Sequence, residues 1–317
     1  MTYTSTMTPF APGDILLGCT LLNDPTDDHA GPGRILQYDE QMKLKGELYT
    51  EGGNHLVGGL SFDRNGILWA FNDLSVLHID PKTGRQLPLS NKFLPRVYRS
   101  ASFASDGKIY LGEHMKADAP PKGIEKLTTT KFPRIPGDNV LGYGMIYQYA
   151  PDYTLLNAWE VDLCPELTGF KGVTHSTLHP SERFITYTAE TSKRIMRWDV
   201  VEGRQMPDLV KYPGDDIRDG NWAIALRYLP DGNLLVTRGK TMDLLDEQGN
   251  VLRTYELEGY GWAEIAVCRN PRQVLLANIW TGMVWKLDLD SGKCIGEIDT
   301  GIRAPKRSVA GVAQYFG

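Results

Sequence analysis

The sequence is poor in cysteine and lacks the motifs of cofactor- and nucleotide-dependent enzymes. Only four cysteines occur in 317 residues, and no two of them form a CxxC pair. Isolated cysteines of this kind are typical of small apolar core residues in a reducing compartment, more than of a disulfide framework or a metal site. The sequence also contains no HExxH zinc motif, GxSxG elbow, phosphate-binding P-loop, dinucleotide fingerprint or CxxCH haem site.

Long apolar runs and an excess of positive charge are absent as well. The N-terminal residues 1–14 have neither the basic region nor the apolar core of a signal peptide, so none is expected. The longest apolar run, residues 15–22, is too short to span a bilayer. The net charge of −5 argues against nucleic acid or an anionic membrane as the main partner. We therefore expect a soluble, cytoplasmic protein.

Helical periodicity is also missing, and short strands repeat in its place. Residues 57–89 contain the runs VGGLSF, ILWAF, SVLHI and RQLPL, separated by the turns DRNG, ND and DPKTG. Apolar runs bounded by Gly, Pro, Asn and Asp are the signature of antiparallel strands. Four such strands in about forty residues form one propeller blade, which needs neighbouring blades to bury its faces.

One group of strands precedes this unit and four follow it, and the preceding group, over residues 14–50, lacks an innermost strand. The C-terminal segment 309–316 resembles the opening strand of the 57–89 unit and is expected to supply it. We predict an all-β fold with one domain over residues 1–317. This fold is a six-bladed β-propeller of four-stranded antiparallel blades, closed by the C-terminal strand joining the first blade. A pair of β-sandwiches is the alternative.

The third blade carries an insertion over residues 115–139. Loops of this length inside compact domains are usually functional or disordered. We predict a lid over the mouth of the propeller channel, and a packed surface excursion or an oligomer contact is the alternative.

The inner strands and PDG-type turns resemble the six-bladed propeller superfamily of SMP-30/gluconolactonase-like, NHL-repeat and strictosidine-synthase-like proteins, and also the seven-bladed streptogramin lyase. The resemblance covers nearly the whole chain. It implies a small-molecule hydrolase of lactonase type, or a lyase in which the propeller supplies a basic histidine and a metal. Lactonases of this group hold a divalent metal with Glu, Asn and Asp side chains at the ends of inner strands. The corresponding positions here are Gly58, Arg99, His175, Trp222 or Ile224, Glu264 and Ala310. Of these, only Glu264 has such a side chain.

Most of the chemically active residues fall in loops of one kind. In a four-stranded antiparallel blade, the connection entering the innermost strand and the loop between the second and third strands lie on the same face. These loops carry four of the six histidines: His29, His55, His114 and His175. The turns of the opposite face hold ordinary turn residues. Because binding groups concentrate in loops on one side of a rigid scaffold, we predict a small-molecule site at the axial mouth of this face.

Three residues are predicted to carry the chemistry of this site. His175 and Glu264 lie at inner strands, as general acid or base and as second acid/base or orienting partner. Arg99 would bind an anionic or developing negatively charged oxygen. The structural alternatives are a hydrogen-bonded histidine at position 175 and a buried ion pair at Glu264.

The predicted substrate-binding residues surround these three: His55, His114, Tyr98, Trp222, Trp262, Trp280 and Arg238. The tryptophans would form a wall for a ring-bearing substrate, so we expect a small organic compound that is aromatic or anionic. A divalent metal ion is left open, and imidazoles would favour zinc, iron, nickel or copper over calcium. The loop Asp27-Asp28-His29 is either a ligand or a solvated turn. The resulting prediction is a hydrolase or lyase, and a non-catalytic ligand- or protein-binding propeller is the alternative.

Overall fold

The structure is a computed structural model, which describes residues 3–20, 31–119, 133–164, 169–302 and 309–317. The predicted ligand loop Asp27-Asp28-His29 and the middle of the insertion, residues 120–132, lie outside the described residues. The one helix within the described ranges is the short 3-10 helix η1 (Ile217–Asp219). A search of the same ranges finds no helix with the length and hydropathy needed to cross a membrane.

The predicted fold class is confirmed: the protein is all-β and has the six four-stranded antiparallel blades of a propeller. The described residues group into two compact units. Unit 1 comprises the blades formed within residues 3–97 and 263–317, and unit 2 those within 98–119 and 134–262.

Unit 1 contains three blades of four strands each. The first has the order β26 (Val309–Gln314), β1 (Ile15–Thr20), β2 (Gly33–Tyr38) and β3 (Leu44–Tyr49). The second consists of β4 (Gly58–Phe62), β5 (Leu68–Asn72), β6 (Ser75–Asp80) and β7 (Arg85–Gln86). The remaining blade of unit 1 is the last in the chain and consists of β22 (Trp262–Val267), β23 (Gln273–Asn278), β24 (Met283–Asp288) and β25 (Cys294–Asp299).

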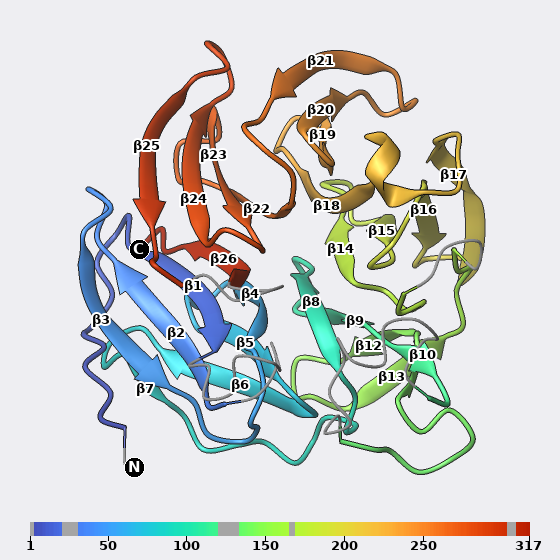
Figure 1. The fold of residues 1–317 in the computed structure, drawn as a ribbon. Helices are drawn as coiled ribbons and strands as arrows, with labels where there is room; N and C mark the ends of the chain where they lie inside the picture. Colours follow the sequence, from blue (N-terminus) through green and yellow to red (C-terminus); the bar gives the residue numbers. More distant parts are fainter. Residues whose placement is uncertain (1–2, 21–30, 120–132, 165–168, 303–308) are drawn as a thin grey trace. The chain divides into compact units, whose positions relative to one another are not determined.

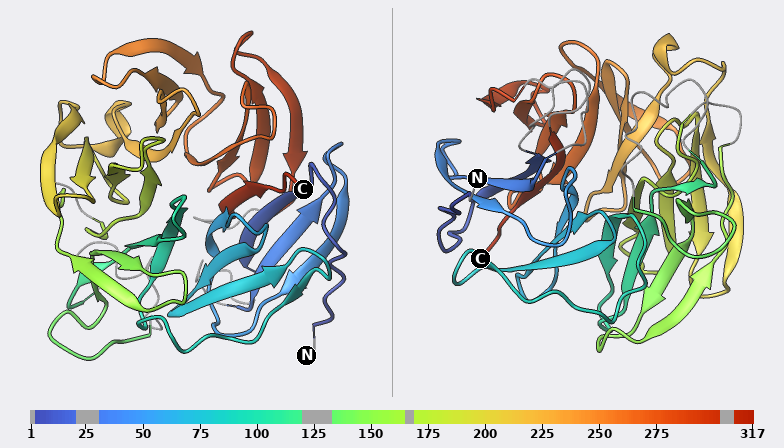
Figure 2. Two further views of the ribbon diagram at one scale, coloured as in Figure 1. Left: turned by 180° about the vertical axis from the view of Figure 1, so that it is seen from behind. Right: turned by 60° about the horizontal axis from the view of Figure 1, so that its bottom comes forward.

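The C-terminal strand closes the first blade, as the sequence predicts. β26 pairs antiparallel with β1, with Leu17 opposite Val312 and a register shift at Gly18/Cys19 (Figures 1 and 2). Gly18 has no room for a side chain, because an added Cβ would lie 2.6 Å from the backbone oxygen of Val57. A bulky residue at this position would force β1 away from the neighbouring blade.

Apolar side chains alternate along these strands and fill the space between neighbouring blades of unit 1. One cluster includes Leu16, Leu68 and Leu77, all fully buried between the first and second blades. Truncating such a leucine to alanine costs about 2–5 kcal/mol of stability. The N-terminal residues add backbone hydrogen bonds outside this core, from Thr6 to Glu47 and from Phe10 to Pro81.

Unit 2 contains the other three blades. The third blade of the chain has the order β13 (Leu155–Trp159), β12 (Ile146–Tyr149), β9 (Ile109–Glu113) and β8 (Tyr98–Phe103). The next consists of β14 (His175–Leu178), β15 (Phe184–Thr188), β16 (Arg194–Asp199) and β17 (Arg204–Lys211). The last consists of β18 (Ala223–Tyr228), β19 (Leu234–Arg238), β20 (Thr241–Leu245) and β21 (Val251–Glu256).

The insertion in the third blade starts and ends in a small ladder of its own. β10 (Lys116–Ala117) pairs with β11 (Gly142–Tyr143), so both ends of the insertion leave the blade side by side. The role of the insertion as a lid stays a prediction.

The cysteines are all free thiols, and three of the four are buried. Burial raises the pKa of Cys19 and of Cys268 to about 11, so both thiols stay protonated at neutral pH. The apolar-filler prediction fits the buried thiols, whereas Cys294 is exposed in the outermost strand of its blade.

Candidate functional site

The predicted site residues of unit 2 lie where innermost strands begin or where second strands end. Tyr98 and Arg99 begin β8, and His175 begins β14. His114 follows the last residue of β9, and Arg238 is the last residue of β19. These are the starts of inner strands and the ends of second strands, where the sequence places them.

His175 is surrounded by positive charge. β14 contacts β8 on one side and β18 on the other, which brings Arg99 and Arg227 toward its ring. The residue is 4% exposed. Burial, followed by the charges of Arg99, Arg227 and His114, lowers the pKa of His175 well below its ordinary value. The imidazole is therefore neutral at pH 7 and able to accept a proton.

Hydrogen bonds between neighbouring strands hold this arrangement in place. The Oγ atoms of Ser100 and Ser176 are 2.7 Å apart. Nη1 of Arg227 donates to the carbonyl oxygen of Ser176 at 3.1 Å. One strand from each of the three blades of unit 2 is thus fixed beside His175, while Arg99 and Arg227 remain half-buried.

His114 packs against the entry to the same strand. Its Nδ1 lies 3.0 Å from Oγ1 of Thr174, and its ring is 5.3 Å from that of Phe170. The preceding residue, Glu113, is fully buried and accepts hydrogen bonds from the Tyr147 hydroxyl and the Met145 amide. This carboxylate holds the third blade together, which leaves His114 as the member of the pair beside His175.

Tyr98 lies inside the third blade. Its residue is 2% exposed, and its hydroxyl is 2.9 Å from that of Tyr149. Burial raises the pKa of Tyr98, so the phenol stays protonated. In this position the side chain supports β8, and a direct substrate contact stays a prediction.

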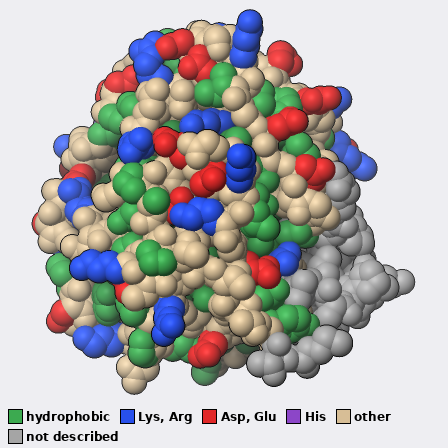
Figure 3. Space-filling view, turned by 90° about the vertical axis from the view of Figure 1, so that its left-hand side faces the viewer, with side chains coloured by type: hydrophobic (Ala, Val, Ile, Leu, Met, Phe, Trp, Pro, Cys, Tyr) green, Lys and Arg blue, Asp and Glu red, His purple; other side chains and the backbone are tan. Residues whose placement is uncertain are grey.

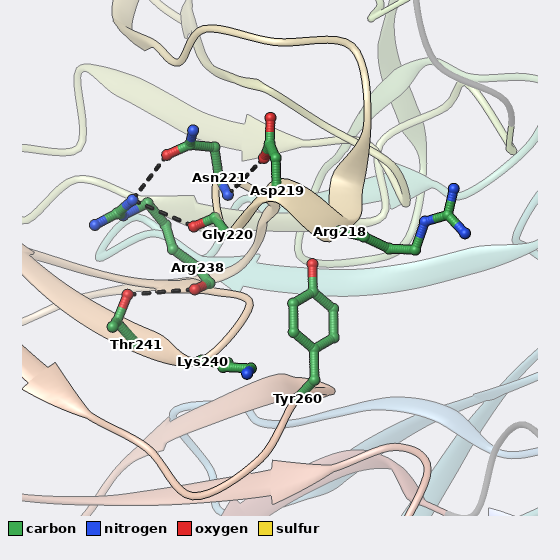
Figure 4. Close-up of a pocket in the computed structure, with 8 residues that line it drawn as sticks. All are labelled: Arg218, Asp219, Gly220, Asn221, Arg238, Lys240, Thr241 and Tyr260. Atoms are coloured by element: carbon green, nitrogen blue, oxygen red, sulfur yellow. Dashed lines mark hydrogen bonds between the residues drawn. The ribbon is translucent and has the colours of Figure 1, made fainter.

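A cavity of about 430 Å³ lies in unit 2 near the predicted binding residue Arg238 (Figure 4). It is formed by residues 218–221, by the turn from Arg238 to Thr241, and by Tyr260. Trp222 lies behind its wall, because the Tyr260 ring stacks on the indole with centroids 5.6 Å apart. Trp222 itself is 3% exposed and donates from Nε1 to the carbonyl oxygen of Glu190.

Arg238 is held rigidly at the edge of this cavity. Its Nε donates to the fully buried carboxylate of Asp243 at 2.5 Å. Its Nη1 donates to Oδ1 of Asn221 at 2.9 Å and to the carbonyl oxygen of Gly220 at 3.3 Å. The guanidinium also lies 5.2 Å from the centre of the Tyr212 ring.

Unit 1 places His55 in a different environment. Its Nδ1 contacts Oδ1 of Asp73, and Nδ2 of Asn72 donates to its carbonyl oxygen. Asp73 also accepts from the backbone amide of Asn54 at 2.8 Å and has a φ of 51°. Left-handed backbone is uncommon outside glycine, although Asp and Asn tolerate it best. The sequence indicated these loop residues separately but not their pairing, which depends on the path of two loops.

Of the three remaining predicted residues, two are buried and one is exposed. Glu264 lies in β22 and is 4% exposed. The indole of Trp262 is buried, and its Nε1 donates to the carbonyl oxygen of Glu258 at 2.9 Å. Trp280 follows β23 and is 38% exposed. Of the two, only Trp280 offers a large surface to a ligand.

Metal ligands do not cluster within the described ranges. No group of three or more His, Cys, Asp or Glu side chains there is arranged to hold an ion. The possible divalent metal therefore stays a prediction.

Charges of both signs are interspersed on the face of the molecule drawn in Figure 3, with small groups of hydrophobic side chains between them. The cationic lining of the cavity in Figure 4 is thus a local feature of a chain with a net charge of −5.

Known proteins resemble this chain in fold alone. No protein-family model matches the sequence, and no curated protein matches it significantly. A chain of the nidogen/laminin complex is similar over 96% of this chain and 98% of its own, with TM-score 0.63 and 12% identity. A Bacteroides caccae protein of unknown function covers 97% and 100%, with TM-score 0.60 and 11% identity. Streptogramin B lyase covers 90% and 73%, with TM-score 0.52 and 13% identity.

The similarity to streptogramin lyase agrees with the resemblance seen in the sequence, while the resemblance to the SMP-30 and NHL families is not confirmed. At these identities the comparisons establish the propeller fold and leave the chemistry to be argued from the residues.

Proposed function

We propose that this protein is a hydrolase or lyase acting on a small organic anion, with His175 as the general base. The observation that supports this most directly is the burial of His175 beside two half-buried residues, Arg99 and Arg227, a setting that lowers the pKa of the imidazole. An uncharged imidazole can take a proton from a substrate carbon or from a water molecule. A bound anion would offset the neighbouring arginine charges and raise the pKa of His175 toward the range in which a general base is effective. A strongly perturbed ionisable group beside specific charge partners is typical of a functional site.

Arg99 is the second participant in this proposal. A guanidinium next to the base would bind a substrate carboxylate or stabilise the negatively charged oxygen that develops as the base removes a proton. Because the His175 ring itself is 4% exposed, a substrate would approach it over the more accessible arginine side chains. His114 would orient the substrate from the same end of the blades.

Glu264 as a second acid or base, the lid role of residues 115–139 and a cytoplasmic location belong to this proposal. None of them is needed for its central step, which is proton abstraction by His175. Glu264→Gln tests the carboxylate directly, because the amide keeps its size and removes its proton-transfer capacity.

The experiment is a screen of esters, lactones and carbon–oxygen lyase substrates with wild type, His175→Ala and His175→Gln. The matched control is His179→Ala, since His179 follows the last residue of the same strand and lies at its other end. We expect turnover of an anionic substrate that both His175 variants lose and the control keeps. Full turnover by a folded His175→Gln would exclude His175 as the base.

The second function considered from the sequence, a non-catalytic binding propeller, predicts the opposite pattern. In that case purified protein turns over none of these substrates at any concentration, and substitutions at His175 change only binding of a partner. The nidogen/laminin similarity shows that the fold occurs in a complex of that kind, and at 12% identity it carries no more than the fold.

A further inference from the structure

The cavity of unit 2 carries an excess of positive charge. Three of its lining side chains, Arg218, Arg238 and Lys240, are cationic, and Asp219 is the carboxylate among the residues that line it. Asp219 is already paired with the buried ammonium of Lys193, which lowers the pKa of this carboxyl. Arg238 and Arg218 also have carboxylate partners outside the lining, Asp243 and Asp216, so Lys240 is the lining cation that has no carboxylate partner among the described residues.

The two inner cations differ in how firmly they are held. Arg238 is fixed through Nε and Nη1 by Asp243, Asn221 and Gly220, and no described residue accepts a hydrogen bond from its Nη2. Lys240 is exposed and, among the described side chains, has no carboxylate within ion-pair distance. A rigid guanidinium and an unpaired ammonium are the donors with which proteins bind carboxylates and phosphates.

Arg218 contributes less than these two. Its side chain is 82% exposed and is paired with Asp216 at 2.9 Å. Exposed pairs of this kind are weak and do not fix a side chain in one place. The anion would thus be held from the side of Arg238 and Lys240.

The opposite side of the cavity is aromatic. Tyr260 is half-buried, projects between Lys240 and Arg218 in Figure 4, and is backed by the buried indole of Trp222 with an interplanar angle of 12°. Because this stack fixes the ring where it lines the cavity, Tyr260 offers a preorganised surface for the apolar body of a ligand.

From this geometry we infer that the cavity binds a small organic anion. Its carboxylate or phosphate group lies on Arg238 and Lys240, and its ring or apolar body lies against Tyr260. The site uses Arg238, one of the predicted substrate-binding residues, and none of the three residues that carry the catalytic proposal: His175, Arg99 and His114. It also stands without the catalytic proposal, because binding is measured in the absence of turnover.

The experiment is calorimetric titration of the full chain with phenyl phosphate, benzoate, inorganic phosphate and the neutral compound benzyl alcohol, at low ionic strength. We expect saturable binding of phenyl phosphate or benzoate and none of benzyl alcohol. The tighter of the two ring compounds identifies the anionic group. Failure of both to bind would overturn the inference, whatever the result of the activity screen.

Two variants and a control locate the bound ligand. Lys240→Glu should weaken binding about tenfold, because a charge pair is replaced by a repulsion. Tyr260→Ala should weaken the ring compounds and leave inorganic phosphate unchanged. Lys293→Glu makes the same charge change at an exposed lysine of another hairpin turn and should have no effect. Equal weakening by the two lysine variants, or none by Lys240→Glu, would contradict the assigned site.

Discussion

His175 and His55 occupy similar places in their blades and have opposite surroundings. Both lie at the entry to an innermost strand, and both are about equally buried, at 4% and 5% exposure. His175 faces the positive charges of Arg99 and Arg227, whereas His55 is paired with the carboxylate of Asp73. The position in the blade thus sets burial, and the neighbouring strands and loops set the electrostatics, so equivalent histidines need not share a role.

The largest expected effect comes from removing the base. His175→Gln should lower turnover of the substrate found in the screen by about 10²–10⁴-fold, the usual contribution of a general base. His55, the histidine paired with Asp73, provides the comparison, because His55→Gln removes an imidazole of about the same burial. If both variants lost activity equally, the distinction between the two histidines would collapse. Rates at saturating substrate give the answer, with circular dichroism to confirm folding.

Acidification should destabilise the fold through histidines that are kept neutral. The pKa of His175 is well below the unfolded value of about 6.5, and burial lowers that of His78 to about 4. Below pH 6.5 the unfolded chain binds protons that the folded chain excludes, so stability falls as the pH drops from 6.5 toward 4. The loss is about 1.4 kcal/mol per pH unit for each such histidine.

Urea unfolding at pH 7, 6 and 5 measures this slope. His175→Gln should flatten it, because the variant removes one of the groups that the unfolded chain protonates. A free energy of unfolding that stays constant over this range would show that the buried histidines are charged in the folded state.

Asp73, the partner of His55, allows a matched pair of substitutions. Asp73→Asn keeps a side chain that tolerates the positive φ, and its amide oxygen can still accept from the Asn54 amide. It loses the negative charge and the oxygen that faces Nδ1 of His55, so we expect a loss of about 1 kcal/mol. Asp73→Ala also removes the acceptor of the Asn54 amide and strains the backbone, so about 2–3 kcal/mol should be lost. Chemical denaturation separates the two. Equal losses for the two variants would place the main contribution in the charge that both remove.

The smallest expected effect concerns the charges around His175. Arg99→Gln should raise the pKa of His175, because it removes the larger of the two guanidinium contributions, and Arg227→Gln should raise it less. Imidazole carbon shifts followed by NMR report both changes. The His179 resonance, from the other end of β14, serves as the internal reference. An unchanged His175 titration in Arg99→Gln would show that the Arg99 charge does not contribute to the lowered pKa.

The sequence predicts most of the fold because blades are local. Each run of apolar residues and each PDG-type turn specifies its own strands, and the C-terminal segment 309–316 carries the pattern of an inner strand. The same locality places His175, Arg99 and Arg238 at strand ends, as observed. For Trp222 the pattern predicts the position in the chain but not the burial of the indole. It is Tyr260, stacked on this indole, that lines the cavity.

What the sequence does not reveal depends on contacts between strands and loops far apart in the chain. The positive charge around His175 comes from residues of two other strands, β8 and β18. The cavity lined by Arg238 and Lys240 is completed by Tyr260, which lies beyond the next strand of the blade. Tyr260 lies between Gly259 and Gly261, and this glycine-flanked aromatic residue is the local signal that could have indicated it.

An NMR titration of the His175 imidazole in the wild-type protein tests the central claim most directly. The account predicts that this ring stays neutral as the pH is lowered through 6.5, while the histidines of the unfolded chain become protonated. A His175 titration midpoint at or above 6.5 would contradict it, because burial and the two neighbouring arginines would then not lower the pKa of the imidazole.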